Sequence, residues 1–353
     1  MTFGFWKGKT VLVTGHTGFK GGWLTIWLKN MGAEVVGYAL QPYSNPALFE
    51  TARVADGIHS IIGDIREGEK LQAVISRHRP EIVFHLAAQS LVRPSYSDPV
   101  TTYATNVMGT VNLLEAVRHA DSVRAVVNVT SDKCYENREW FWPYRENDPL
   151  GGYDPYSSSK GCAELVTSAY RNSFFKQGVA LASARAGNVI GGGDWAQDRL
   201  VPDIMSALIE GRPLTIRNPD AIRPWQHVLE PLNGYLMLAE RLWAQGQEFA
   251  EAWNFGPGSE DARPVSWVVD RLYNVWGRGP DWERDRSVQP HEAGVLKLDS
   301  SKARTRMRWR PRLNLDTTLE WVAAWYQAHG AGLDMRRITE NQIADYNKMK
   351  VEE

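Results

Sequence analysis

Residues 9–40 read KTVLVTGHTGFKGGWLTIWLKNMGAEVVGYAL and predict one complete βαβ unit. The apolar run Lys9–Val13 is typical of a strand that is buried in a parallel sheet. Thr14–Gly22 is a glycine-rich turn, and Trp23–Asn30 has the apolar spacing of a helix. Glu34–Leu40 is the second predicted strand. The unit indicates that the chain begins with a parallel strand pair joined by a helix.

Further strand-like runs alternate with helical segments along the next part of the chain. These runs are Ile58–Ile62, Ile82–Leu86, Val123–Val129 and Val179–Ala184. Alternation of this kind is typical of a doubly wound parallel sheet of the Rossmann type. The pattern then loosens into shorter helices such as Pro202–Glu210 and Val265–Trp276. We therefore predict an α/β protein with a Rossmann-type domain over residues 1–186 and a smaller, mixed α/β lobe over residues 187–353, of which about 222–255 returns to the first domain.

The composition excludes several classes of protein. The 353 residues are 43% hydrophobic and 23% charged, which is ordinary for a globular protein. A net charge of −1 argues against a nucleic-acid-binding protein, so an anionic substrate would need a local basic cluster. Cys134 and Cys162 are too few for a disulfide framework, no apolar run reaches the ~18 residues of a membrane span, and the N-terminus lacks a signal-peptide stretch. The eight histidines show no metal-ligand spacing. We expect a cytoplasmic protein that binds neither membrane nor metal.

The glycine-rich turn has the pattern of a phosphate-binding loop. Gly15, Gly18 and Gly21 are spaced GxxGxxG between a predicted strand and a predicted helix. Small residues let the backbone turn sharply, and the helix N-terminus offers free N–H groups to a pyrophosphate. Turns also use glycine for conformational reasons alone, but this position favours a dinucleotide site. The acidic residue expected at the end of the second strand is replaced by Leu40-Gln41-Pro42, which leaves the choice between NAD and NADP open.

Tyr156 and Lys160 form the second candidate functional motif. They are four residues apart in PYSSSKG, so on a helix they share one face. A nearby ammonium favours the phenolate, and a tyrosine with a pKa of about 10 could then accept a proton near neutral pH. By spacing alone the pair could equally be a tyrosine packed on an exposed lysine. Downstream of the glycine turn, the pair favours catalysis.

Several segments together resemble the extended short-chain dehydrogenase/reductase family, from about residue 8 to at least residue 312. These segments are GHTGFKG (15–21), HLAAQS (85–90), TNVMGTVNLLEA (105–116) and YSSSK (156–160). Four others are similar to the CDP-glucose 4,6-dehydratases: TSDKCYEN (130–137), GNVIGGGDWAQDRLVPD (187–203), AIRPWQHVLEPL (221–232) and HEAGVLKLDSSKA (291–303). The resemblance implies a lyase of deoxysugar and polysaccharide biosynthesis that uses NAD to dehydrate CDP-D-glucose to CDP-4-dehydro-6-deoxy-D-glucose.

The resemblance also implies the catalytic residues. Related sugar-nucleotide dehydratases carry Thr-Asp-Glu where this chain has Ser131, Asp132 and Lys133. Tyr156, helped by Lys160 and Ser131, would remove the proton of the sugar 4-hydroxyl while C4 gives hydride to the cofactor. Protonated Asp132 would then supply a proton to the departing 6-hydroxyl, and hydride would return to C6. Lys133 is by position the base for the C5 proton, or alternatively a residue that positions Tyr156 or water.

The binding residues follow from the same resemblance. NAD would contact Gly15, Thr17, Gly18, Phe19, Lys20, Gly21, Asp64, Ile65, Leu86, Ala87, Ala88, Tyr156 and Lys160. The nucleotide-sugar would contact Gln89, Asn188, Arg199, Leu200, Arg217, Arg223, Asn254 and His291. Lys20 could meet either a pyrophosphate or a 2′-phosphate, and His16 is interpreted as a packed loop residue.

Three alternatives stay open at the level of the sequence. A UDP-sugar 4-epimerase is disfavoured by the ionisable pair Asp132–Lys133, because epimerases perform no elimination. Another nucleotide-sugar 4,6-dehydratase is possible, since nothing in the residues distinguishes cytosine from thymine. A non-catalytic dinucleotide-binding regulatory protein would not need Ser131, Tyr156 and Lys160 intact. The family further implies a homodimer, or a dimer of dimers, formed through helices around 105–119 and 156–175.

Overall fold

A seven-stranded parallel sheet forms the centre of the molecule in the computed structural model, which describes residues 4–287 and 293–350. The strand order is β11-β6-β5-β4-β1-β2-β3, and every neighbouring pair is parallel. The strands are β1 (Thr10–Thr14), β2 (Glu34–Ala39), β3 (His59–Ile62), β4 (Ile82–His85), β5 (Ala125–Val129), β6 (Ala180–Arg185) and β11 (Ala252–Asn254). The predicted α/β class with a doubly wound parallel sheet is confirmed. The direction of winding reverses between β1 and β4, and ligands of such sheets bind at this switch point, beyond the carboxyl ends of the strands.

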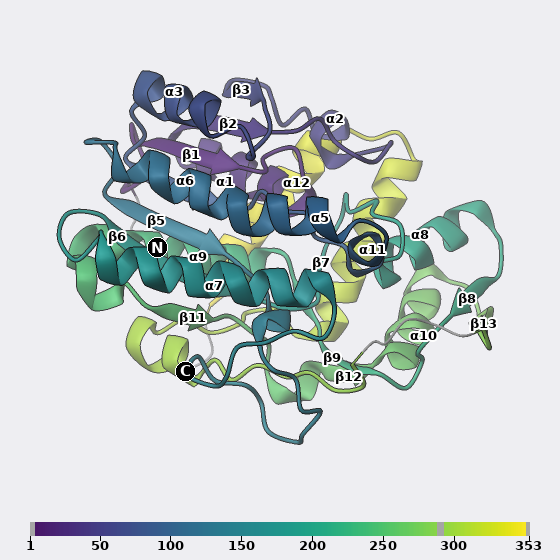
Figure 1. Ribbon diagram of the computed structural model, residues 1–353. Helices are drawn as coiled ribbons and strands as arrows, with labels where there is room; N and C mark the ends of the chain where they lie inside the picture. The colour runs from purple at the N-terminus through teal and green to yellow at the C-terminus, as the bar shows by residue number, and fades with distance from the viewer. Residues whose placement is uncertain (1–3, 288–292, 351–353) are drawn as a thin grey trace.

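Helices cover both faces of the sheet (Figure 1). Side chains alternate along β1, so Val11 and Val13 belong to one hydrophobic core and Leu12 to the other. The first core also contains side chains of α1 (Phe19–Asn30), α9 (Leu229–Gln245), α11 (Leu315–Gly330) and α12 (Met335–Lys348). The second is closed by side chains of α3 (Gly68–His78) and α6 (Gly109–Arg118), with α7 (Pro155–Ser173) beside α6.

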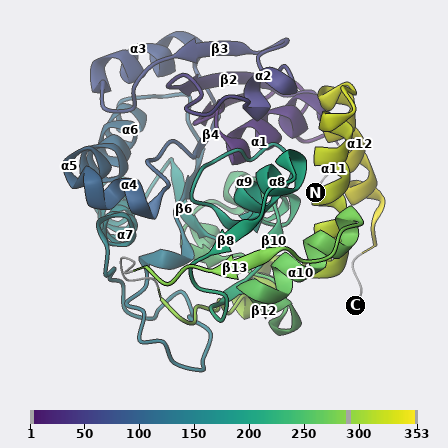
Figure 2. The ribbon, with the colours of Figure 1, turned by 90° about the vertical axis from the view of Figure 1, so that its right-hand side faces the viewer.

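Three small two-stranded sheets and two helices form most of the remaining lobe in the described part of the chain. The strand pairs are β7 (Val189–Ile190) with β10 (Gln226–His227), β8 (Leu214–Ile216) with β13 (Trp282–Arg284), and β9 (Ile222–Pro224) with β12 (Ala262–Pro264). The helices are α8 (Leu200–Glu210) and α10 (Val265–Trp276). Of these elements, α8, β8, β13 and α10 lie to the right of the main sheet in Figure 1, and Figure 2 views the molecule from that side. Strand β11 and helix α9 lie with the main sheet, although they follow this lobe's first strands in the chain.

Short helices complete the chain. They are α2 (Leu48–Thr51), α4 (Val92–Ser97), α5 (Pro99–Tyr103), η1 (Ala104–Met108), η2 (Asp132–Cys134), η3 (Gly246–Phe249), η4 (Ser259–Asp261) and η5 (Ala303–Met307). Within the described residues, none of the helices combines the length and the apolar character needed to cross a membrane.

Helix α1 begins four residues earlier than the sequence predicts, at Phe19 instead of Trp23. Gly18 is the N-cap with extended backbone, and Gly21 lies inside the first helical turn. A Cβ atom on Gly21 would lie 2.0 Å from the carbonyl oxygen of Gly15. Gly21 is therefore a helical residue whose missing side chain lets the helix pack against the turn, and sequence patterns assign such glycines to loops.

Candidate active site

A cavity of about 980 Å³ lies at the carboxyl end of the sheet and extends into the smaller lobe. It is lined by all the predicted cofactor and catalytic residues and by Gln89, Asn188, Arg199, Leu200, Arg217 and Arg223. Asn254 does not line it, and His291 lies outside the described residues. Among the residues that the structure describes, no group of three or more His, Cys, Asp or Glu side chains could hold a metal ion.

The prediction that Asn254 contacts the nucleotide-sugar is corrected by the structure, because the Asn254 amide is hydrogen-bonded inside the protein. It is fully buried at the end of β11, where its Oδ1 accepts a hydrogen bond from the hydroxyl of Tyr135 at 2.7 Å. Its Nδ2 donates to the carbonyl oxygens of Tyr144 and Asp299 at 2.9 and 3.1 Å. Asn254 therefore ties the edge strand to loops of the chain and has no free group to offer a substrate.

The glycine turn leaves its backbone open to a ligand. Gly15 has a φ of +80°, and a Cβ there would lie 2.8 Å from the amide nitrogen of Ala87. Thr17 fixes the far side of the turn by donating from Oγ1 to the carbonyl oxygen of Leu40 at 2.8 Å. Gly15 therefore lets the turn pack against the chain that follows β4, while Gly15, Thr17 and Gly18 line the cavity beside the N-terminus of α1, where a pyrophosphate can bind.

His16 is packed beneath this turn and is not exposed to the cavity. Its Nε2 lies 2.8 Å from Oγ of Ser60, and burial lowers its pKa to about 4. A Cβ on Gly37 would lie 2.4 Å from the His16 ring, so β2 leaves room for the imidazole. These contacts fit the interpretation of His16 as a structural residue.

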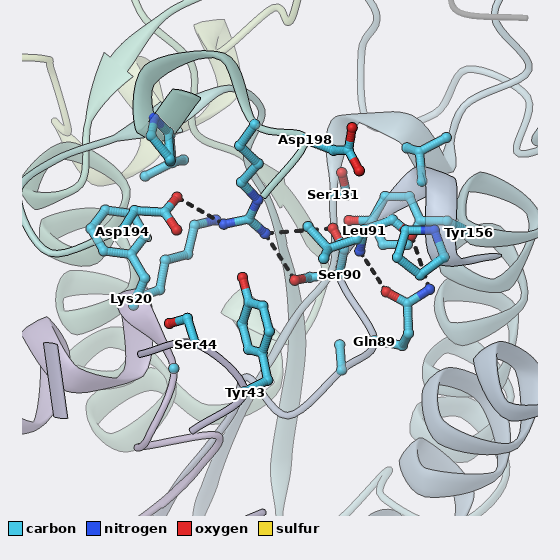
Figure 3. Close-up of a pocket in the computed structure, with 18 of the residues that line it drawn as sticks. Lys20, Tyr43, Ser44, Gln89, Ser90, Leu91, Ser131, Tyr156, Asp194 and Asp198 are labelled. Atoms are coloured by element: carbon cyan, nitrogen blue, oxygen red, sulfur yellow. Dashed lines mark hydrogen bonds and ion pairs between the residues drawn. The ribbon is translucent and has the colours of Figure 1, made fainter. Parts of the chain in front are cut away.

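Tyr156 lies in the first turn of α7, which begins after the N-cap Asp154. Burial raises the pKa of Tyr156 to about 12, while its hydrogen bond with Ser131 and the charge of Arg199 lower it. Figure 3 shows Tyr156 and Ser131 near each other at one side of the cavity. The sequence argument assigned the lowering of this pKa to Lys160, whose own pKa burial lowers to about 8. The structure adds Arg199, 43 positions away in the chain from Tyr156, as a cation that favours the phenolate.

Asp132 is a buried carboxyl in the turn that follows β5. Burial raises its pKa, and Lys133 and Ser131 oppose this effect only in part. The hydroxyl of Ser131 donates to Oδ1 at 3.0 Å, whereas Oδ2 has no hydrogen-bond partner in the described part of the chain. A Cβ on Gly187 would lie 1.8 Å from Oδ2. Asp132 thus occupies space that only a glycine at 187 leaves open, and no sequence signal marked this glycine.

A buried ion pair holds the catalytic turn from both ends. Arg185 donates from Nη2 to Oε2 of Glu164 at 2.7 Å, and both side chains are 3% exposed. Glu164 also accepts from the hydroxyl of Thr130, while Arg185 donates to the hydroxyl of Tyr135 at 2.7 Å. Burial raises the pKa of Glu164, but Arg185 outweighs it, so the pKa is lowered overall. Sequence reasoning missed the pair; its signal was an arginine at the end of a largely apolar strand.

Cations gather in the middle of the cavity. Arg199 pairs with Asp194 at 2.9 Å and donates to Oγ of Ser90 at 2.8 Å, so it bridges the smaller lobe and the loop after β4 (Figure 3). Burial, together with the charges of Arg199 and Lys160, lowers the pKa of Lys20 to about 7. Arginine and lysine in such surroundings are the groups that bind phosphates.

Arg223 and Arg217 line the part of the cavity that the smaller lobe contributes. Arg223 is held by backbone carbonyls, donating to Ile222 at 3.0 Å and to Gly294 at 3.1 Å. Arg217 pairs with Asp198 at 2.9 Å. These two arginines come from β9 and from the residue after β8.

The chain was compared with known families and structures. The GDP-mannose 4,6 dehydratase family matches residues 12–254. The CDP-glucose 4,6-dehydratase of Salmonella typhimurium is 57% identical over 348 residues, which is 97% of each chain. The UDP-glucose 4-epimerase of Mycolicibacterium smegmatis is 28% identical over 86% of this chain and 94% of its own length.

Solved structures show the same fold. The dTDP-glucose 4,6-dehydratase of Bacillus anthracis, in complex with NAD, has a TM-score of 0.79 and 23% identity, covering 93% of this chain and 100% of its own. The UDP-glucose 4-epimerase of Stenotrophomonas maltophila has a TM-score of 0.81 and 21% identity, with coverages of 92% and 99%. From the family match and the 57% identity, the chain belongs to the GDP-mannose 4,6-dehydratase family of extended short-chain dehydrogenases/reductases.

Proposed function

We propose that this protein is an NAD-dependent hydro-lyase that converts CDP-D-glucose to CDP-4-dehydro-6-deoxy-D-glucose in deoxysugar biosynthesis. The observation that carries the proposal is Asp132, a buried carboxyl with a raised pKa. Its neighbour Ser131 is hydrogen-bonded both to Asp132 and to Tyr156. Loss of water needs an acid that can hold its proton, and burial raises the pKa of Asp132 in that direction. A 4-epimerase eliminates nothing and has no use for such a group. The cytidine assignment is supported by the 57% identity to the Salmonella typhimurium enzyme.

The cofactor would lie in the cavity with its pyrophosphate against Gly15, Gly18 and the N-terminus of α1. Gly15 and Gly18 line the cavity, and the N-terminus of α1 beside them offers N–H groups to the pyrophosphate. The remaining cofactor contacts would be those that the sequence analysis assigns. NAD, when bound, supplies an acceptor for hydride from C4 of the sugar and later the donor to C6. Lys160 would hold the ribose next to Tyr156.

Tyr156 would accept the proton of the sugar 4-hydroxyl at its phenol oxygen. A phenol with a pKa of about 12 is a poor base unless its anion is stabilised. Ser131 and Arg199 supply a hydrogen bond and a positive charge for that purpose. Oxidation at C4 then creates a ketone, which acidifies the proton at C5.

Elimination would divide its two proton transfers between neighbouring residues. Lys133 would take the C5 proton, and Asp132 would give its own proton to the departing 6-hydroxyl, so that water leaves. Lys133 is half-buried and lines the cavity beside Asp132. An amine must be neutral to act as a base, so this role requires Lys133 to lose its proton before elimination.

Product analysis tests the proposal. The protein with NAD is incubated separately with CDP-, dTDP-, UDP- and GDP-glucose, and the alkali-induced absorbance of a 4-keto-6-deoxy sugar is followed. We expect product from CDP-glucose and none from a Tyr156→Phe variant. A 4-epimer as the product, or no reaction with any of the four, would contradict the proposal.

We also propose that the enzyme works in the cytoplasm as a homodimer, or a dimer of dimers, built on α6 and α7. These helices lie side by side on one face of the sheet (Figure 1). Apolar side chains near and on them are exposed, including Met108 at 52% and Leu165 at 60%. Two free cysteines suit a reducing compartment. Sedimentation analysis measures the mass in solution, and a monomer at micromolar concentration would be the contrary result.

A further inference from the structure

Five charged side chains meet where the smaller lobe closes one end of the cavity. We call this group the Asp198 corner; it consists of Arg93, Asp198, Asp203, Arg217 and Asp285, all of which line the cavity. Arg217 lies 2.9 Å from Oδ1 of Asp198, and Nε of Arg93 lies 3.6 Å from the same oxygen. The Asp198 carboxylate is therefore shared by two guanidinium groups from different elements: Arg93 is in α4, and Arg217 follows β8.

The backbone at Asp198 is held in an unusual conformation. Asp198 has a φ of +62°, a left-handed conformation that residues other than glycine rarely adopt. Its N–H donates a hydrogen bond to the carboxyl of Asp203. Its carbonyl oxygen accepts a hydrogen bond from Nη2 of Arg217 at 3.4 Å. Such a conformation persists only where the surroundings stabilise it, and it fixes where the Asp198 carboxylate points. Asp198 is among the labelled lining residues in Figure 3.

The charge of the corner is unsuited to a diphosphate. Three carboxylates, those of Asp198, Asp203 and Asp285, surround two guanidinium groups. Burial, and after it the charge of Asp198, raises the pKa of Asp203 to about 6. A further anion would be repelled here, whereas the middle of the cavity offers Arg199 and Lys20. The corner instead suits a neutral group that has both hydrogen-bond donors and acceptors.

Pyrimidine bases differ in the order of such groups along their edge. Cytosine presents an amine donor at position 4, followed by acceptors at N3 and O2, whereas uracil and thymine present an acceptor at position 4. Asp198 can only accept hydrogen bonds, and Arg217 can only donate them. The Asp198 carboxylate can therefore accept a hydrogen bond from the cytosine amine at position 4, while the Arg217 guanidinium donates to N3 or O2. The same pair would set the carboxylate against the O4 oxygen of uracil or thymine.

We propose that Asp198 and Arg217 read the edge of the cytosine base and give the enzyme its preference for cytidine nucleotides. The inference rests on the proposed function, because it assumes that the nucleotide of the substrate reaches this end of the cavity. In this arrangement Arg93 and Asp203 position the Asp198 carboxylate and do not contact the base themselves.

The test measures binding of CDP, UDP and dTDP to the NAD-saturated protein by calorimetry, before and after Asp198→Asn. An asparagine amide can donate to O4 as well as accept from the cytosine amine, so the preference of the protein for CDP over UDP should fall about 10- to 100-fold. Asp198→Ala, which can neither accept nor donate, should lower the affinity for CDP more than the affinity for UDP. Asp121→Asn is the matched control, because Asp121 forms an exposed ion pair with Arg79 at 3.0 Å, outside the cavity lining. It removes the same charge and should leave the preference unchanged.

The outcomes separate this inference from the proposed function. If the wild-type protein prefers CDP and both Asp198 variants keep that preference, the inference is overturned and the proposed function stands. An equal loss of affinity for all three nucleotides would make Asp198 a purely structural residue and would also overturn it. If the wild-type protein prefers UDP or dTDP, the cytidine assignment itself fails.

Discussion

Adding one methyl group at Gly187 should displace the Asp132 carboxyl, the proposed general acid, without changing its chemistry. In Gly187→Ala, the new Cβ would lie 1.8 Å from Oδ2 of Asp132, and ordinary contacts begin at 3.4 Å. The carboxyl must therefore move by about 1.6 Å. Misplacing a catalytic group by about 1 Å can cost about 10²-fold in rate. We expect the elimination of water to slow by at least about 10²-fold.

The first oxidation should survive, because the three atoms nearest to the new methyl group all belong to Asp132 and none to Tyr156. Enzyme-bound NADH should thus accumulate during a single turnover with CDP-glucose, and its absorbance can be followed by stopped flow. Asp132→Asn should behave in the same way, since a general acid contributes about 10²–10⁴-fold. Gly330→Ala is the matched control, because a Cβ at Gly330 meets nothing within 4 Å. If Gly187→Ala dehydrates its substrate at nearly the normal rate while Asp132→Asn does not, the Asp132 carboxyl acts without needing the position against Gly187 that we assign to it.

Three further predictions follow from the site and the core. Tyr156→Phe should abolish all steps, so that no NADH appears on mixing with substrate; any NADH formed would exclude Tyr156 as the base. Lys133→Met should still oxidise C4 but lose exchange of the C5 hydrogen with deuterated solvent, measured by mass spectrometry, whereas Lys133→Glu should retain more activity. Exchange at the wild-type rate in Lys133→Met would leave Lys133 only a positioning role. Burial raises the pKa of Glu230 from 4.5 to about 7, so the folded state binds its proton more tightly than the unfolded state. The resulting stabilisation of about 3 kcal/mol is complete below pH 4.5 and is lost as the pH rises towards 7. Urea unfolding should show this loss in the wild type and much less of it in Glu230→Gln.

The parts of the site that were predictable are those whose chemistry is local. The glycine turn and the pair Tyr156–Lys160 each depend on the spacing of residues within a single strand, turn or helix. A glycine at a positive φ such as Gly15, or two side chains four residues apart on a helix, leaves a pattern in the sequence itself. The sequence therefore placed Gly15 in the turn and Tyr156 and Lys160 on one helix, whereas it assigned Gly21 of α1 to the turn.

Contacts between distant segments left no such pattern. Gly187 and Asp132 are 55 positions apart, and Arg199 meets Ser90 across 109 positions. A glycine that makes room for a carboxyl cannot be distinguished from a turn glycine until the strands are paired. Asn254 was misassigned for the related reason that an amide can bind a ligand or satisfy its own chain, and only the surrounding carbonyl groups decide between these roles.

The packing of α12 on α1 has a consequence for how the chain is made. Trp27 of α1 contacts Tyr346 of α12 edge to face, with ring centroids 5.7 Å apart, and the hydroxyl of Tyr346 bonds to Glu230 of α9 at 2.8 Å. More than 300 positions separate the end of α1 at Asn30 from the start of α12 at Met335, so α1 is synthesised long before the helix that packs on it. A nascent chain released at residue 186 would expose Trp23 and Trp27 to water, so we expect such a fragment to aggregate.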